Sequence, residues 1–374
     1  MFRQLQAPLK NLFYQEKGPI ILILGMRQVG KSTIALSLVE KRKYVRFDFD
    51  LVSDRLEFVN QNRHDLALFA EKYKDSIVII DEIQKSSDAT LVIKHLYDNF
   101  HTKFILTGSS ELKIRKGLGD SLAGRVHEVR LYPMSLKEIN IQQGLSWESK
   151  DEYKNYDINQ QNLLKALSFG TLPNLLNIQR DEYETYLNDY TNTIISKDVL
   201  EIAGTRKSTQ VFLLAKLLAL QIGQLVNFNE LSLNVGLSRE SVYRYIDIFE
   251  QMGLIVRAKP ISTNEREAIT KATKIYFTDL GVRNSLIGNF NSLNQRLDKG
   301  QLLENAVFVG IKRSDDYQNI KASLGFFRSV YGSEIDIVKK VDNLEYLFEV
   351  KITDRSKKKN VKIVTLETAQ KYLY

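Results

Sequence analysis

Residues 20–32 read Ile-Ile-Leu-Ile-Leu-Gly-Met-Arg-Gln-Val-Gly-Lys-Ser, and this stretch decides the fold. The apolar run at 20–24 is typical of a buried parallel strand, and residues 33–39 have helical spacing. The turn between them fits the pattern G-x-x-x-x-G-K-[ST], in which backbone N–H groups and the positive end of a helix face phosphate oxygens. The sequence therefore predicts a phosphate-binding loop rather than an ordinary glycine-rich turn. Its residues are Gly25, Met26, Arg27, Gln28, Val29, Gly30, Lys31, Ser32 and Thr33.

The second half of a nucleotide site is expected about 50 residues further on. There the apolar run 77–80 ends in Asp81 and Glu82, which would lie beside the phosphates at the carboxyl end of a buried strand. We expect Lys31 to bind the β- and γ-phosphates, and Ser32 and Asp81 to hold Mg²⁺. Glu82 would orient and deprotonate the attacking water. The alternative is a strand end that carries two solvated acids.

A further strand, at 103–110, is expected to lie between these two strands and to place a hydroxyl near the γ-phosphate. Ser109 is the first candidate for that hydroxyl and Thr107 the second. After this strand, Arg125 precedes a further strand at 126–131. An arginine here could stabilise charge on the transferred phosphoryl group, in cis or from a neighbouring subunit, or it could be an ordinary surface residue.

Composition narrows the class of protein without identifying it. A chain of 374 residues predicts two or three domains, and the net charge of +8 is compatible with an anionic partner such as DNA. Zero cysteines exclude disulfides and thiolate metal sites, and four histidines make a zinc site a poor expectation. No apolar run reaches membrane-spanning length, and residues 1–13 do not read as a signal peptide. We therefore expect a cytoplasmic protein with no membrane association.

With these motifs in place, residues 20–135 resemble the AAA+ branch of P-loop ATPases, in a prokaryotic group with large C-terminal extensions related to the STAND-like ATPases. In that family the corresponding motifs are Walker A, Walker B, sensor 1 and the arginine motif. Here they read GMRQVGKS (25–32), IVIIDE (77–82), FILTGSS (104–110), and SLAGR followed by LYPMS (121–125 and 131–135). The resemblance implies ATP and Mg²⁺ as ligands, ATP hydrolysis as the activity, and a ring or dimer if Arg125 acts in trans.

The middle of the chain reads as a helical lid followed by a winged helix. Residues 142–162 are polar and read as a linker, and Phe169-Gly170-Thr171-Leu172-Pro173 resembles the Gly-Gly-x-Pro element of the family's lid, with Thr171 in place of the second glycine. Long helices are expected at 183–200 and 209–222. They would pack on each other and cover the nucleotide.

The segment 227–260 has the spacing of a winged helix–turn–helix. It comprises a short helix at 228–234, a turn, and Ser238 as the N-cap of a helix that ends near Met252. A wing begins at 254–257. The second helix would present Arg239, Tyr243 and Arg244 to the major groove of DNA, although such modules also serve in packing or in protein docking.

The last third of the chain carries a second set of charged residues. A helix at 300–312 bears Glu304, and strands at 325–328, 333–338 and 344–351 follow. Glu334 and Asp336 would share one face, as would Glu349 and Lys351. The residues Glu304, Asp336, Glu349 and Lys351 resemble the PD-(D/E)xK nuclease site, in which carboxylates hold the metal that activates water. The alternatives are a solvated sheet face or a nuclease fold kept as scaffold, and Lys357–Lys359 could contact phosphates or form a solvated loop.

The sequence thus predicts an α/β protein with a P-loop NTPase parallel sheet (1–140), a helical lid (141–225), a winged helix (226–282) and an α/β nuclease-like domain (283–374). The leading function is an ATP-hydrolysing AAA+-type switch associated with DNA. One alternative is an ATP-gated, Mg²⁺-dependent endonuclease. The other is a nucleotide-switched scaffold for protein partners that retains a vestigial nuclease fold.

Overall fold

The structure is a computed structural model in which two compact units follow each other along the chain, Met1–Tyr132 and Pro133–Tyr374. The predicted lid, winged helix and nuclease-like segments all lie in the second unit. The residues described are 1–59, 63–109, 122–145, 152–205, 207–261, 273–329, 334–353 and 361–373. Among them, no helix combines the length and the apolar character needed to cross a membrane.

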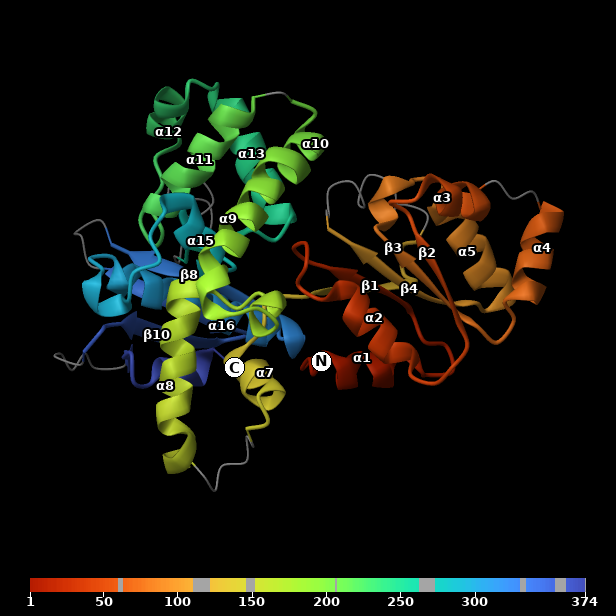
Figure 1. Cartoon of the computed structure of the whole chain (residues 1–374), viewed down its shortest axis with the longest axis horizontal. Coiled ribbons are helices and arrows are strands. Elements are labelled where there is room, and N and C mark those ends of the chain that lie inside the picture. The colour runs from red at the N-terminus through yellow and green to blue at the C-terminus, as the bar shows by residue number, and fades with distance from the viewer. Residues whose placement is uncertain are drawn as a thin grey trace. The chain divides into compact units, whose positions relative to one another are not determined.

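The first unit is built on a parallel sheet with the strand order β2-β3-β4-β1-β5 (Figure 1). Its strands are β1 (Ile20–Leu24), β2 (Tyr44–Asp48), β3 (Ile77–Asp81), β4 (Lys103–Gly108) and β5 (Val126–Arg130). The predicted strands are confirmed. The strand that was expected to lie between the phosphate-loop strand and the strand ending in Asp81 is β4, and it pairs with both β1 and β3. β1 and β3 are buried at every residue, as a parallel sheet covered on both faces requires.

Helices cover both faces of this sheet, and alternate side chains of β1 point to opposite faces. Ile20, Leu22 and Leu24 belong to a buried cluster with residues of α3, α4 and α5, whereas the buried Ile21 and Ile23 point to the other face, which α1 and α2 cover. The helices are α1 (Gln6–Phe13), α2 (Lys31–Val39), α3 (Val52–Val59), α4 (Arg63–Lys72) and α5 (Ala89–Phe100). The carboxyl ends of the strands therefore form the edge at which the predicted loop lies.

The second unit begins with helices and continues into a mixed sheet. The helices are α7 (Leu136–Gln142), α8 (Glu152–Phe169), α9 (Tyr183–Thr193), a π-helical turn (Ile194–Val199), α10 (Leu200–Ala203), α11 (Ser208–Leu220), α12 (Phe228–Val235), α13 (Arg239–Gln251), α15 (Leu280–Ile287) and α16 (Lys299–Tyr317). α8 differs from the sequence prediction, because it starts inside the polar stretch expected to be a linker. It ends at Phe169, and Gly170, which follows it, has a φ of 72° that suits a left-handed helix terminus.

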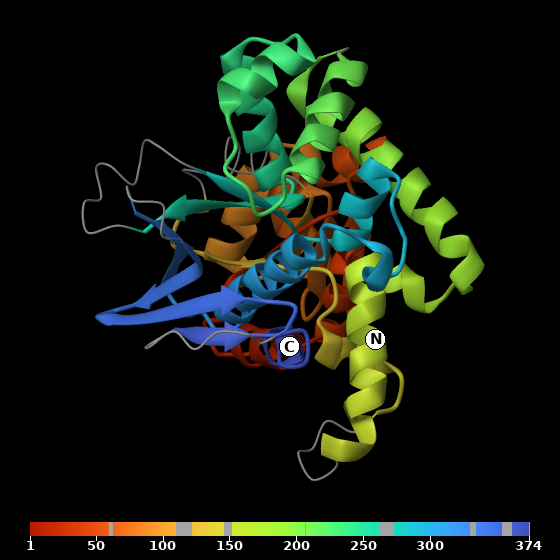
Figure 2. The ribbon, with the colours of Figure 1, turned by 90° about the vertical axis from the view of Figure 1, so that its left-hand side faces the viewer.

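The sheet of the second unit has the order β11-β10-β9-β8-β6-β7. Its strands are β6 (Ile255–Pro260), β7 (Lys274–Phe277), β8 (Ala322–Arg328), β9 (Glu334–Val341), β10 (Leu344–Val350) and β11 (Lys362–Val364). β6 and β7 form an antiparallel pair directly after α11–α13, and β6 also pairs in parallel with β8. The hairpin expected to be a wing is thus part of one continuous sheet with the strands expected to be nuclease-like, and α16 lies against this sheet (Figure 2).

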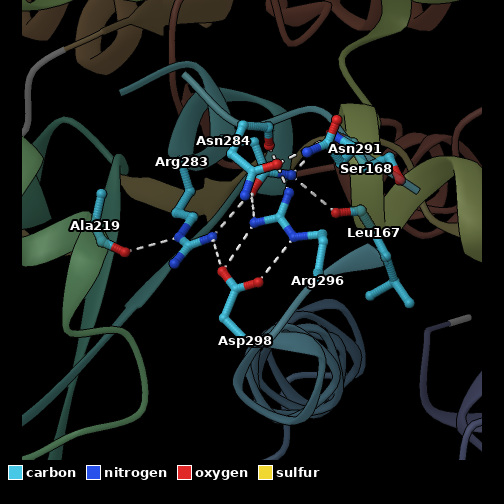
Figure 3. Close-up of polar contacts among 9 residues, drawn as sticks. Leu167, Ser168, Ala219, Arg283, Asn284, Asn291, Arg296 and Asp298 are labelled. Atoms are coloured by element: carbon cyan, nitrogen blue, oxygen red, sulfur yellow. Dashed lines mark hydrogen bonds and ion pairs between the residues drawn. The ribbon is translucent and has the colours of Figure 1, made fainter. Parts of the chain in front are cut away.

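A buried polar network joins the helices of the second unit around α15 (Figure 3). Arg283 donates to Ala219 O at 2.7 Å, at the end of α11, and Asn284 donates to Leu167 O and Ser168 O near the end of α8. Arg283 and Arg296 both bind Asp298, so the two buried guanidinium groups share one carboxylate. These bonds satisfy helix-terminal carbonyls that would otherwise be buried without a partner.

Candidate nucleotide site and a second carboxylate cluster

The loop at 25–32 curls as the glycine pattern predicts. Gly25 has a φ of 152°, and a Cβ at this position would lie 2.3 Å from Leu131 O, so a larger residue cannot be accommodated. Gly30 has a φ of 95° and precedes the first turn of α2. The buried Lys31 side chain donates to Gly25 O at 3.0 Å and to Met26 O at 2.9 Å. Two hydrogen bonds therefore hold the ammonium group inside the loop, at the N-terminus of a helix.

Asp81 is the centre of the polar contacts beside this loop. Its Oδ1 accepts hydrogen bonds from Ser32 Oγ at 3.1 Å and from Thr107 Oγ1 at 2.7 Å. Its Oδ2 accepts from Arg46 Nε at 2.7 Å. The hydroxyl of Ser32 and the carboxylate of Asp81 are hard oxygen ligands that face each other, so this pair fits a Mg²⁺ ion.

Glu82 lies next to Asp81 and is held separately. Its backbone is left-handed, with a φ of 55°. Its Oε2 accepts hydrogen bonds from Ser109 Oγ at 3.0 Å and from the Gln84 amide, which also donates to Ser109 Oγ. Both candidate hydroxyls of the third strand thus contact the acidic pair, Thr107 at Asp81 and Ser109 at Glu82. We call the residues 25–32, Asp81 and Glu82 the phosphate-loop site.

Arg125 lies at the other end of β1 from the loop. Its backbone O accepts from Ile20 N, and its side chain forms a bidentate ion pair with Asp98 at 2.7 and 2.9 Å. This pair lowers the pKa of Asp98. The length of β1, at about 3.3 Å per residue, separates Arg125 from the phosphates of its own chain. The position of Arg125 therefore does not favour the cis role, and a role in trans and an ordinary surface ion pair with Asp98 stay as alternatives.

The sequence reasoning missed two arginines that contact this site. Arg46, on β2, binds Asp81 while its side chain is 42% exposed. Arg3 is 2% exposed, and it donates to Val29 O in the loop at 2.6 Å and to Tyr132 O at 2.5 Å. Their partners are distant in sequence, and no local pattern marks either residue.

The predicted nuclease residues do come together in the second unit. We call Glu304, Glu334, Asp336 and Glu349, with Lys274 and Lys351, the C-terminal cluster. Asp336 Oδ2 accepts from Val350 N at 2.8 Å, and Lys351 Nζ lies 2.8 Å from Glu349 Oε1. Burial raises the pKa of Asp336, and burial together with the charge of Asp336 raises that of Glu304, although Lys274 lowers both. Glu304, Asp336, Glu349 and Lys351 therefore lie close enough for their charges to interact.

A metal ion, however, does not fit this cluster as it stands. The sequence did not predict that Lys274 belongs to this cluster. Its Nζ lies 3.1 Å from Glu304 Oε1 and 2.7 Å from Glu334 Oε1. Tyr276 also donates to Glu304 Oε1 at 2.7 Å. In the described part of the chain, no group of three or more His, Cys, Asp or Glu side chains is arranged to hold a metal.

The predicted DNA-contact residues lie on α13, but two of them have structural partners. Arg244 donates to Ala203 O at 2.6 Å, at the end of α10. Tyr243 stacks on Phe228 with ring centroids 4.4 Å apart and is 40% exposed. Arg239 is exposed in the first turn of the helix, where Ser238 provides the predicted N-cap. Lys357–Lys359 lie outside the described residues.

Comparison with known proteins finds a match for the first unit. Residues 17–140 match the family described as an AAA domain, which agrees with the phosphate-binding loop and the parallel sheet described above. Residues 160–293 and 299–372 match two domains of unknown function, DUF8612 and DUF4143. These matches do not reveal what the second unit does.

Relatives extend over both units. An uncharacterized protein of Methanocaldococcus jannaschii is 26% identical over 323 residues, which are 78% of this chain and 67% of that protein. An uncharacterized protein of Haemophilus influenzae is 25% identical over 356 residues, which are 89% of this chain and 83% of that protein. The Walker-type ATPase of Pyrococcus abyssi is a structural neighbour with a TM-score of 0.46 and 18% identity, covering 76% of this chain and 95% of that one.

Proposed function

We propose that the chain is an ATP-hydrolysing switch in which the phosphate-loop site binds ATP with Mg²⁺. The observation that carries this proposal is the convergence of Ser32 and Thr107 on one oxygen of Asp81, beside a loop that holds Lys31. Convergence of this kind is expected where a strand end and a helix N-terminus share a phosphate-bound cation. The AAA domain match over 17–140 supports the same activity.

Each side chain has a distinct task in this proposal. Lys31 and the loop N–H groups bind the phosphates, and Ser32 and Asp81 hold Mg²⁺, which supplies charge neutralisation at the transferred group. Glu82 accepts a proton from the attacking water. Ser109 and Gln84 fix the Glu82 carboxylate through hydrogen bonds to the same oxygen. Arg46 gives up Asp81 Oδ2 when the cation binds.

Arg3 offers a route by which the loop can act on the rest of the chain. Its guanidinium group binds Val29 O in the loop and Tyr132 O, and the next residue, Pro133, begins the second unit. A shift of the loop on nucleotide binding is therefore transmitted to the end of the first unit. The second unit is the part of the chain that the switch controls.

The experiment for this proposal is a steady-state measurement of phosphate release with purified full-length protein. We expect Glu82→Gln to retain ATP binding and to lose hydrolysis by roughly 100-fold or more, because it removes the base and leaves the phosphate contacts in place. Glu71→Gln, a change at an exposed acid of the same unit, is the matched control. Unchanged turnover in Glu82→Gln would reject the role of Glu82, and no ATP turnover in the wild type would reject the proposal.

DNA is the partner that we propose for the second unit, through the exposed Arg239 at the start of α13. In this proposal α12 and α13 form the helix–turn–helix and β6 begins the wing of a winged helix. The net charge of +8 supports an anionic partner. Binding should weaken steeply as salt rises, and Arg239→Ala should reduce the salt slope by about 1. Binding that does not depend on salt, or no binding, would favour the protein-scaffold alternative.

A further inference from the structure

The C-terminal cluster contains its own cation. Lys274 is on β7, and its side chain is 3% exposed. Its ammonium group joins Glu304 of α16 to Glu334 of β9 and lies 5.3 Å from the ring centroid of Phe326 on β8. Carboxylates from two elements and an aromatic face thus surround one buried positive charge.

The surroundings keep that charge in place. Burial by itself would lower the pKa of Lys274, but the carboxylates of Glu304 and Glu334 raise it above its usual value. Tyr276 also donates to Glu304 Oε1 at 2.7 Å, so this carboxylate is held by a second hydrogen bond. Displacement of the ammonium group would break its ion pairs with Glu304 and Glu334. A buried pair of this kind resists opening, since separation leaves an uncompensated charge in a low dielectric.

A divalent cation would need the same oxygens. Mg²⁺ and Mn²⁺ bind carboxylate oxygens at about 2.0–2.2 Å, inside the space that an ammonium group fills at hydrogen-bond distance. The two cations would also repel each other strongly at such a separation. Occupancy by the lysine and occupancy by the metal are therefore mutually exclusive.

We propose that the Lys274 ammonium takes the place of the divalent cation in the C-terminal cluster, so that the second unit retains nuclease-like carboxylates and does not cleave DNA. Through this internal cation, the carboxylates of Glu304 and Glu334 link the helix α16 to the strands β7 and β9. Removal of the lysine uncovers a latent site for a hard divalent cation. This proposal is independent of ATP hydrolysis in the first unit.

The test is a titration with Mn²⁺ alone, followed by calorimetry or by electron paramagnetic resonance. Nucleotide-free full-length protein with Asp81→Asn is the parent, because this change removes the carboxylate that is proposed to hold Mg²⁺ in the phosphate-loop site. Lys274→Ala and Lys274→Gln are made in the parent, each with and without Glu304→Gln. Lys339→Ala is the matched control, since Lys339 is another poorly exposed lysine of the same sheet and pairs with Asp315 rather than with the carboxylates of the cluster.

We expect the parent and the Lys339→Ala variant to show no saturable Mn²⁺ binding. Lys274→Ala should bind one Mn²⁺ with a Kd on the order of 10⁻⁴ M, as a weak carboxylate site does, and Glu304→Gln should abolish that binding. Binding by the parent that Glu304→Gln removes would overturn the proposal. The absence of binding in folded Lys274 variants would overturn it as well.

Folding gives a second measurement if the Lys274 variants are unstable. A chain that lacks the ammonium should refold when Mn²⁺ is present and fail without it, because a ligand that binds only the native state stabilises it. Recovery of folded protein by Mn²⁺, and its loss on adding Glu304→Gln, would support the proposal. Failure to refold at any Mn²⁺ concentration would contradict it.

Discussion

The phosphate-loop site and the C-terminal cluster both bring carboxylates together, and at each of them a basic side chain from the same unit pairs with carboxylates. At the first, Arg46 binds Asp81 through a side chain that is 42% exposed. At the second, Lys274 binds Glu304 and Glu334 through a side chain that is 3% exposed. An exposed guanidinium can turn into solvent when a metal arrives, whereas a buried ammonium cannot.

This difference shows that convergent carboxylates do not define a metal site by themselves. The residue that supplies the opposing charge, and the ease with which it leaves, decide whether the site is open to a cation. Exposed ion pairs contribute roughly 0–1 kcal/mol, and breaking a buried pair costs roughly 3–5 kcal/mol.

The largest expected effect is on folding, at the buried pair. Lys274→Met leaves Glu304 and Glu334 without their cation, so the free energy of unfolding should fall by about 3–5 kcal/mol. Urea denaturation of the second unit, monitored by circular dichroism, measures the change. Adding Glu304→Gln should recover part of the loss, since it removes one of the unpaired charges. A Lys274→Met chain as stable as the wild type would show that the ammonium is not what holds the cluster.

The next effect is on hydrolysis at the phosphate-loop site. Lys31→Ala should lower ATP turnover by roughly 100-fold or more, because a preorganised positive charge at the phosphates is lost. A phosphate-release assay measures the rate, and Lys17→Ala, a change at an exposed lysine of the same unit, serves as the control. Normal turnover in Lys31→Ala would refute the assignment of the loop.

A smaller effect concerns pH and the network around Asp298. Although burial opposes it, hydrogen bonds from Arg296 and Arg283 lower the pKa of Asp298 to about 2 from an ordinary 3.8. The ionised carboxylate of Asp298 therefore stabilises the fold above about pH 4. This contribution is lost as the pH falls from about 4 towards 2, where the carboxylate becomes protonated. The difference in unfolding free energy between wild type and Asp298→Asn should be constant near neutral pH and shrink in that window. A difference that does not vary with pH would contradict this reading of the network.

The smallest effect is on the metal requirement at the exposed pair. Arg46→Gln removes the guanidinium that competes with Mg²⁺ for Asp81, so the Mg²⁺ concentration that gives half-maximal ATP turnover should fall. A decrease of roughly two- to fivefold is expected of a half-exposed ion pair. A higher Mg²⁺ requirement in Arg46→Gln would indicate that Arg46 assists the cation rather than competing with it.

Local patterns in the sequence predicted the parts of the fold that local chemistry determines. The loop at 25–32 needs its glycines because the backbone there adopts positive φ and passes close to Leu131 O. The strand ends at Asp81 and Thr107 follow from apolar runs that a parallel sheet buries. Period two predicted that Glu349 and Lys351 share one face of their strand, and their side chains form an ion pair.

The parts that failed depend on contacts between distant segments. Arg3, Arg46 and Lys274 bind partners 26 or more residues away, and nothing around them in the sequence marks them. The strand direction bears on the cis role considered for Arg125, because this residue precedes β5 and so lies at the amino end of the sheet. The strand β6 was expected to begin a separate wing. Its pairing with β8 could not be predicted from a local pattern, because it joins residues that are more than 60 positions apart.

The most direct test of the contrast measures phosphate release and DNA cleavage in one reaction. It uses full-length protein with ATP and Mg²⁺ or Mn²⁺ on linear, supercoiled and branched DNA, comparing wild type, Glu82→Gln and Asp336→Asn. We predict phosphate release that only Glu82→Gln abolishes, and intact DNA in every reaction. Metal-dependent cleavage by the wild type that disappears in Asp336→Asn would contradict the account.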